Sequence, residues 1–238
     1  MRWSEASRLR RAVVAIASLA LLAAAPTGMD PENPTCPKAL NWTSYPEMRF
    51  TLREEKGRRV LLAEGKIDTG MVTRLADAIE TNKPIQEIWL RSPGGSASIG
   101  NEAGRLIRSL NIATRIPATW ACFSACNFVF MGGPVRWVDP GGLFVVHMFT
   151  HLSDRDAVKE DLARGTDEAI ETIGDIEQGS ALLASDDNDF LIRMGVSRKL
   201  LTEVMYRQKA IAGQGEDRST RRCLTQDELF RYRVTNVR

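Results

Sequence analysis

Two residues of this chain have the types that acyl-transfer chemistry requires, and each follows a short apolar segment. Ser124 comes after Ala121-Cys122-Phe123, and His147 comes after Phe144-Val145-Val146. A serine hydroxyl is a weak nucleophile until a base accepts its proton. A neutral imidazole is the usual base near pH 7, and the chain has only two histidines, His147 and His151. Ser124 and His147 are therefore the candidate nucleophile and base.

A glycine pair could complete this chemistry. Gly94-Gly95 stands in the loop Ser92-Pro93-Gly94-Gly95-Ser96, directly after a short apolar segment. Glycine has no Cβ, so a backbone N–H can approach a reacting carbonyl closely. Ser124 stands where a helix is expected to begin, and the unpaired N–H groups of a helix start stabilise negative charge. The three pieces together would supply nucleophile, base and oxyanion hole, whereas each alone is ordinarily a packed serine, a structural histidine or a turn.

Alternating strand and helix patterns are expected to position these residues. Residues 49–53 and 59–63 predict a hairpin, 85–90 and 114–120 predict strands, and 142–149 predicts a strand that ends near His147. Apolar residues at helical spacing predict helices over 71–79, 99–110 and 123–131, and a long helical region over 154–208 with a break near 185–189. Thr225 and Glu228 form a capping-box pattern for a last helix. This alternation predicts an α/β fold with a mostly parallel sheet and flanking helices.

Composition and missing motifs exclude several function classes. The formal net charge is +2, and the first 25 residues hold four arginines against one glutamate, so the remainder is close to neutral and nucleic-acid binding is not expected. There is no Gly-x-Ser-x-Gly elbow, phosphate loop, dinucleotide motif or His-Glu-x-x-His, so no cofactor and no metal are expected. Lys66, which could serve as the base of a Ser/Lys peptidase, is expected to be a solvated residue at a strand end.

The N-terminus has the layout of an export signal. A basic segment, Arg2–Arg11, precedes an uncharged, alanine-rich run that ends in small residues before Pro26. We expect residues 1–25 to be a signal peptide, with an uncleaved membrane anchor as the alternative. Residues 26–46 are proline-rich and predict a linker or arm, and 47–238 would form the domain.

Four cysteines follow the predicted signal: Cys36, Cys122, Cys126 and Cys223. An even number of cysteines in an oxidising compartment favours disulfides. Four cysteines allow three pairings, and the sequence does not choose among them. Free thiols, or a zinc site that uses Cys122 and Cys126, are the alternatives, although a C-x₃-C spacing without a second pair is a weak zinc motif.

The order of these motifs resembles the proteolytic subunit of Clp protease and its exported relatives in the crotonase-like superfamily. The resemblance covers residues 60–150: a strand leading into Ser92-Pro93-Gly94-Gly95, then Ser124-Ala125 before Gly132-Gly133, then Val145-Val146-His147. It resumes at Leu224–Leu229. It implies a ClpP/crotonase-like fold of repeated ββα units. The cysteines that flank Ser124 depart from the family pattern.

The resemblance also implies roles for individual residues. Ser124 would attack the acyl carbon, and His147 would act as base and then as acid. The N–H groups of Gly95 and Ala125 would form the oxyanion hole, and the strand after the glycine loop would pair with an extended peptide.

The third catalytic member is where the sequence departs most from the family. The best-aligned position for the family's acid is near Arg221, which cannot orient an imidazole. Asp217, Asp187 and Asp189 are the alternative candidates, and a Ser/His dyad or an inactive site are the other interpretations.

The leading functional hypothesis is an exported, periplasmic serine peptidase that acts on a peptide or protein. The alternatives are a catalytically inactive ClpP-like module that binds peptides or proteins, and a crotonase-type enzyme that acts on thioesters. The family also implies a homo-oligomer, and no ATPase partner is expected outside the cytoplasm.

Overall fold

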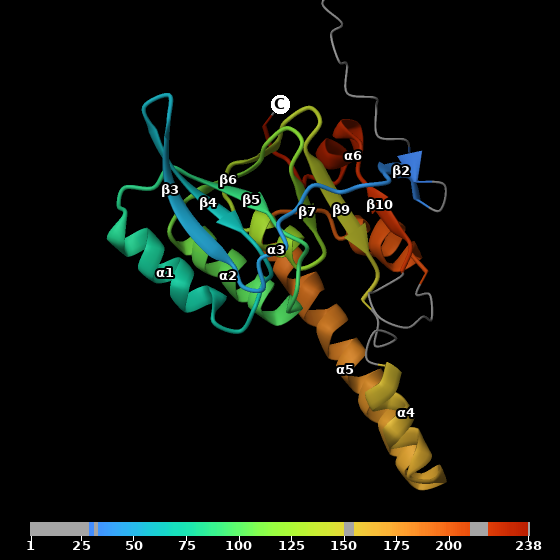
Figure 1. Cartoon of the computed structure of the whole chain (residues 1–238). Coiled ribbons are helices and arrows are strands. Elements are labelled where there is room, and N and C mark those ends of the chain that lie inside the picture. Colours follow the sequence, from blue (N-terminus) through green and yellow to red (C-terminus); the bar gives the residue numbers. More distant parts are fainter. Residues whose placement is uncertain (1–28, 31–32, 150–154, 210–218, 238) are drawn as a thin grey trace, which may run out of the picture.

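The computed structural model describes residues 29–30, 33–149, 155–209 and 219–237. The predicted signal segment lies outside these residues. The described chain forms a five-stranded sheet, a three-stranded sheet and a two-stranded ribbon, with helices packed around them (Figure 1). The mixed α/β character and the mostly parallel pairing that the sequence predicts are confirmed.

The five-stranded sheet is parallel except for its first pair. Its order is β3-β4-β5-β6-β8, and its strands are β3 (Arg49–Glu55), β4 (Arg58–Glu64), β5 (Glu87–Arg91), β6 (Ala113–Ile116) and β8 (Arg136–Val138). The antiparallel β3–β4 pair is the predicted hairpin. Its turn places Lys56 and Gly57 at positive φ, as the tight turns of hairpins require.

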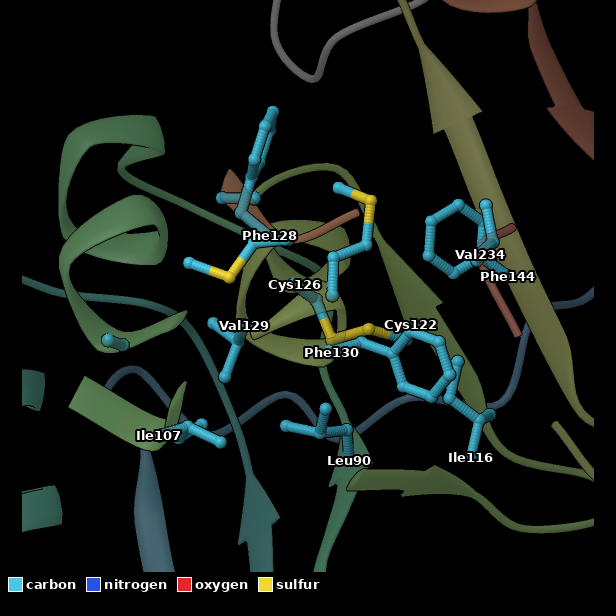
Figure 2. Close-up of a cluster of buried hydrophobic side chains, with 14 of the residues drawn as sticks. Leu90, Ile107, Ile116, Cys122, Cys126, Phe128, Val129, Phe130, Phe144 and Val234 are labelled. Atoms are coloured by element: carbon cyan, nitrogen blue, oxygen red, sulfur yellow. A yellow bond between two sulfur atoms is a disulfide. The ribbon is translucent and has the colours of Figure 1, made fainter. Parts of the chain in front are cut away.

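Three helices pack on one face of this sheet: α1 (Met71–Thr81), α2 (Ala97–Ser109) and α3 (Cys126–Met131). Their apolar residues meet alternate strand residues such as Ile88 and Leu90, which are fully buried. Figure 2 shows Phe130 and Val129 of α3 at the centre of this cluster, next to a disulfide. The core therefore fixes α3 and the turn that precedes it.

The three-stranded sheet has the order β10-β9-β7 and consists of β7 (Ala121–Phe123), β9 (Leu143–His147) and β10 (Arg221–Cys223). The expectation of a single strand over 114–120 was wrong, because β6 ends at Ile116 and β7 begins at Ala121 in the other sheet. Pro117 has no N–H to continue the ladder. The Ser92 N–H donates to Ala121 O and the Phe123 N–H donates to Ser92 O, which joins the two sheets at the glycine loop.

The helical region over 154–208 differs from its prediction. α5 (Thr166–Arg193) runs without a break through 185–189, and the interruption lies instead at Gly165, between α5 and α4 (Arg155–Ala163). Burial of Phe190 and Leu191 in the core outweighs the weak helix propensity of the Ser and Asp residues there. Figure 1 shows α5 extending away from the sheets, with α4 along its far end.

The remaining elements are short. They are η2 (Leu200–Val204), η3 (Met205–Arg207), α6 (Gln226–Arg231), and the ribbon strands β1 (Met29–Asp30) and β2 (Asn33–Pro37). The capping box of Thr225 and Glu228 is confirmed at α6. None of the helices in the described ranges is long and apolar enough to cross a membrane.

The N-terminal segment lies against the C-terminal strand. The Arg221 N–H donates to Asn33 Oδ1 over 2.6 Å, and the Cys223 N–H donates to Thr35 Oγ1 over 3.1 Å. A disulfide between Cys36 and Cys223 fixes the same pair of strands. Residues 33–37, expected to be an irregular linker or arm, thus form a strand held against β10.

Candidate active site

Ser124 occupies a strained turn between β7 and α3. Its φ of 57° lies in the left-handed region that residues other than glycine rarely adopt. Gly94 approaches this turn so closely that a Cβ on it would lie 2.7 Å from the Ser124 Cβ. The glycine loop and the serine turn therefore fit together only with glycine at position 94, and Ser124 is partly exposed.

The register of two parallel strands brings His147 to this turn. Phe123 pairs with Val145, so β7 ends two residues before the end of β9. The Ser124 N–H donates to Val145 O over 3.3 Å, and Asn127 Nδ2 donates to the same oxygen over 2.7 Å. As a result, His147 Nε2 lies 2.6 Å from Ser124 Oγ, within hydrogen-bond distance.

A pair of stacked aromatic rings packs against the imidazole of His147. The Phe123 and His147 ring centroids are 4.5 Å apart, and the Trp42 ring stacks on Phe123 with its centroid at 5.5 Å. Asn41 O accepts a hydrogen bond from the Ala121 N–H over 2.9 Å, so the segment that carries Trp42 is itself attached to β7. The sequence predicted none of these positioning residues.

Asn127 was also not identified from the sequence, although the sequence contains an indication of its role. It is a polar residue in the otherwise apolar run that follows Ser124, and it is fully buried. A buried amide must find hydrogen-bond partners, and its bond to Val145 O ties α3 to the strand of the histidine. A buried asparagine three residues after a candidate nucleophile could therefore have indicated a positioning role.

The predicted oxyanion-hole donors, Gly95 and Ala125, both line the same cleft as Ser124 and His147. Within the described ranges, neither N–H donates to a protein acceptor. Gly95 has a φ of 147°, and a Cβ there would lie 2.2 Å from Ile67 O. The loop thus leaves the Gly95 N–H available while its neighbours Gly94 and Ser96 bond to Ile67.

This cleft has a volume of about 390 Å³. Its walls come from the glycine loop, the serine turn, β9, α5 and η3. The residues that line it are Pro93, Gly95, Ser96, Ala97, Phe123, Ser124, Ala125, Phe128, His147, Phe149, Leu183, Asp187 and Met205. Lys66 does not line the cleft and is exposed, as expected of a solvated residue.

The candidates for a third catalytic member have different positions. Asp187 lies in the cleft, where its Oδ1 accepts a hydrogen bond from Asn101 Nδ2 over 3.1 Å rather than one from His147. Asp189 lies outside the cleft and pairs with Arg193 and Arg105. Asp217 falls outside the described residues. Arg221, the position expected to align with the family's acid, lies opposite His147 in the β9–β10 register.

The environment of Asp187 perturbs its titration. Burial raises the pKa of this carboxyl from 3.8 to about 6, and the neighbouring charge of Asp186 adds to the effect, while the Asn101 hydrogen bond opposes it. Asp187 in turn helps burial to raise the pKa of Tyr206 to about 12. The cleft therefore contains a carboxylate whose charge is poorly stabilised by the protein.

We expect Asp187→Asn to stabilise the fold at neutral and alkaline pH. A raised pKa means that the folded state holds the proton more tightly than the unfolded state, so the carboxylate destabilises the protein increasingly as the pH rises from about 4 to about 6. From the size of this shift, the gain in the free energy of unfolding should approach about 3 kcal/mol at pH 8 and vanish near pH 3.5. Urea unfolding of both proteins at these two pH values measures it. A loss of stability at pH 8 would contradict the prediction.

The four cysteines form two disulfides, Cys36–Cys223 and Cys122–Cys126. The expectation of disulfides is therefore confirmed, and no free thiol remains. The Cys122–Cys126 bond spans Ser124 symmetrically and is fully buried, so it closes a small ring around the strained turn. Among the described residues, no group of three or more His, Cys, Asp or Glu side chains could hold a metal ion.

No protein-family model matches this sequence, and no curated protein matches it either. Among solved structures, the chain is similar to a mutant of ClpP1 from Listeria monocytogenes. The two share 16% sequence identity with a TM-score of 0.46, over 74% of this chain and 88% of the ClpP1 chain.

Proposed function

We propose that this protein is an exported serine peptidase of ClpP-like architecture, with Ser124 as nucleophile and His147 as general base. The observation that carries the proposal is the 2.6 Å contact between Ser124 Oγ and His147 Nε2 in a cleft. The Gly95 and Ala125 N–H groups line the same cleft without a protein acceptor in the described ranges. Nucleophile, base and oxyanion donors are the set that acyl transfer needs.

In the proposed reaction, Ser124 Oγ attacks the carbonyl carbon of a peptide bond while its proton passes to His147 Nε2. The carbonyl oxygen becomes an oxyanion, which the Gly95 and Ala125 N–H groups stabilise. Collapse of this intermediate breaks the C–N bond, and the leaving amine takes the proton from His147. Water then attacks the acyl-enzyme by the same route, which releases the acid and restores the serine.

A fluorophosphonate probe tests this proposal. It should form a covalent adduct on Ser124 of the folded protein, and the adduct should be absent from Ser124→Ala, as peptide mapping by mass spectrometry would show. The matched control is Ser96→Ala, because Ser96 is a second serine that lines the cleft but has no histidine partner in the described chain. If folded wild-type protein is not labelled, or if labelling survives Ser124→Ala, the proposal fails.

The remaining parts of the proposal concern location and partners. Two disulfides suit an oxidising compartment, and together with the basic and apolar N-terminus they support export by a signal peptide to the periplasm. The substrate would be a peptide or protein, and no ATPase partner is expected. Exposed apolar side chains along α5, among them Ile170 and Ile173, support self-association of the chain.

One observation favours a second candidate, a non-catalytic module that binds peptides in the same cleft. Arg221 lies opposite His147 in the neighbouring strand, at the position expected to align with the family's acid. A binding module would retain peptide affinity in Ser124→Ala and would show no turnover in the wild type. Fluorescence anisotropy with a labelled peptide library, run beside the turnover assay, separates the two candidates.

A further inference from the structure

Asp187 is a buried acid that lines the same cleft as the candidate catalytic pair. It lies on α5 and is only 5% exposed, yet it lines the same cavity as Ser124 and His147. Its hydrogen bond comes from Asn101, an uncharged side chain on α2 that is itself buried. Within the described ranges, no lysine or arginine lies within 4 Å of its carboxylate, although Arg residues pair with its neighbour Asp189.

An uncompensated charge of this kind is unfavourable for the free protein. A buried carboxylate is ordinarily paired with a cation or a metal ion. The described residues offer neither at this place. A buried carboxylate of this kind suits a binding site in which the ligand supplies the cation. Such a carboxylate discriminates strongly between cationic and neutral ligand groups, because it is shielded from water.

Several apolar side chains line the cleft together with Asp187, which is the only acid among the described lining residues. Leu183 lies one helical turn before it on α5, and Met205 and Phe128 contribute from η3 and α3. Apolar walls with a single acid suit a side chain that has a long aliphatic stem and a cationic end. Lysine and arginine are the side chains of this kind.

We infer that the cleft is specific for substrates with a lysine or arginine side chain next to the bond that is cut, and that Asp187 binds its cationic end. This inference rests on the proposed function for the identity of the bond, but the cationic pocket itself does not require turnover. Asp187 would act as a specificity-determining residue. It would not be the partner of His147, because its hydrogen bond comes from Asn101.

Labelling rates with matched phosphonate probes test the inference. Three aminoalkyl-phosphonate diphenyl esters with lysine-like, leucine-like and glutamate-like side chains are compared with an alkyl fluorophosphonate that has no such side chain. In the wild type, the lysine-like probe should react with Ser124 about 100-fold faster than the leucine-like probe. In Asp187→Asn this ratio should fall to within a few-fold, when each rate is divided by the rate of the alkyl fluorophosphonate on the same variant.

Two further variants serve as a control and as a replacement for Asp187→Asn. Asp189→Asn removes an exposed acid of the same helix, and it should keep the wild-type preference. Asp187→Ser removes the carboxylate with a smaller side chain, and it replaces Asp187→Asn if that protein does not fold. A wild type that labels with the alkyl probe but reacts equally with all three side chains would overturn the inference and leave the proposed function standing.

A binding measurement separates the inference from catalysis altogether. In Ser124→Ala, p-aminobenzamidine should bind and gain fluorescence, while the neutral analogue p-aminobenzamide should not compete. The gain should be lost in the double variant Ser124→Ala/Asp187→Asn. If no probe labels Ser124, the peptidase proposal fails; binding of the amidinium that depends on Asp187 would then still support the cationic pocket, and its absence would overturn it.

Discussion

His147→Ala is expected to lower the rate at which Ser124 is acylated by at least about 10⁴-fold, with little change in peptide affinity. Without the imidazole, no group at 2.6 Å accepts the serine proton, and a serine hydroxyl alone is a poor nucleophile. Because the base acts in the chemical step and not in ground-state binding, the loss should fall on kcat and leave KM nearly unchanged. Stopped-flow or steady-state kinetics with a chromogenic ester measures this split.

The control for this variant is His151→Ala, which removes the only other histidine of the chain. It should retain the wild-type rate. A second check concerns folding, since His147 also packs against Phe123. His147→Gln keeps a side chain of similar length in that position, so it should be as inactive as alanine while melting near the wild-type temperature. Activity above one tenth of the wild type in His147→Gln would exclude His147 as the base.

Removal of the Cys36–Cys223 disulfide is expected to lower the free energy of unfolding by about 5 kcal/mol. The bond joins residues separated by 187 positions, and closing a loop of that length restricts the unfolded chain strongly. Total stabilities of domains are of order 5–15 kcal/mol, so Cys36→Ala/Cys223→Ala should unfold at a much lower urea concentration. Equilibrium unfolding followed by circular dichroism measures the difference.

The second disulfide of the same protein provides the comparison. Cys122 and Cys126 are separated by 4 positions, so loop closure alone gives only about 2 kcal/mol for this bond. Cys122→Ala/Cys126→Ala should therefore unfold closer to the wild type, while its Ser124 labelling slows because the strained turn is less well fixed. If loss of the Cys122–Cys126 bond lowered the free energy of unfolding more than loss of the Cys36–Cys223 bond, loop closure would not explain the contribution of either disulfide.

The elements with strong local patterns could be predicted from the sequence. The hairpin around Lys56-Gly57 and the capping box of Thr225 depend on interactions within a few residues, and both were correct. The alternation of strands and helices was sufficient for the α/β class. Local signals thus gave most elements of the central part of the chain.

The two stretches whose secondary structure was predicted wrongly share a physical cause, which is contact with distant parts of the chain. Residues 185–189 have poor helix propensity, but burial of the adjacent Phe190 and Leu191 in the core keeps them helical. The segment 114–120 looks like one strand, but the chain leaves the five-stranded sheet after Ile116 and joins the three-stranded sheet only at Ala121. Both results depend on contacts with distant residues, so no local pattern could show them.

The candidate site was predicted in part for the same reasons. The residue types and order indicated Ser124 and His147, and the structure brings them into contact. Asp187 was one of three candidates for the third member; the structure places it in the cleft with Asn101 as its partner, which spacing in the sequence did not indicate. The stack of Trp42 on Phe123 joins residues far apart in the chain and had no sequence signal.

The link between the two ends of the chain also sets an order of events during biosynthesis. Cys36 is made early and Cys223 near the end, and β9, which carries His147, lies between β7 and β10 in its sheet. Because β10 ends at Cys223, the three-stranded sheet cannot be completed until nearly the whole polypeptide has been synthesised. β7 and β9, which bring Ser124 and His147 together, are made earlier, so a nascent chain can pair these two strands before β10 and the disulfide cover the outer edge of β9.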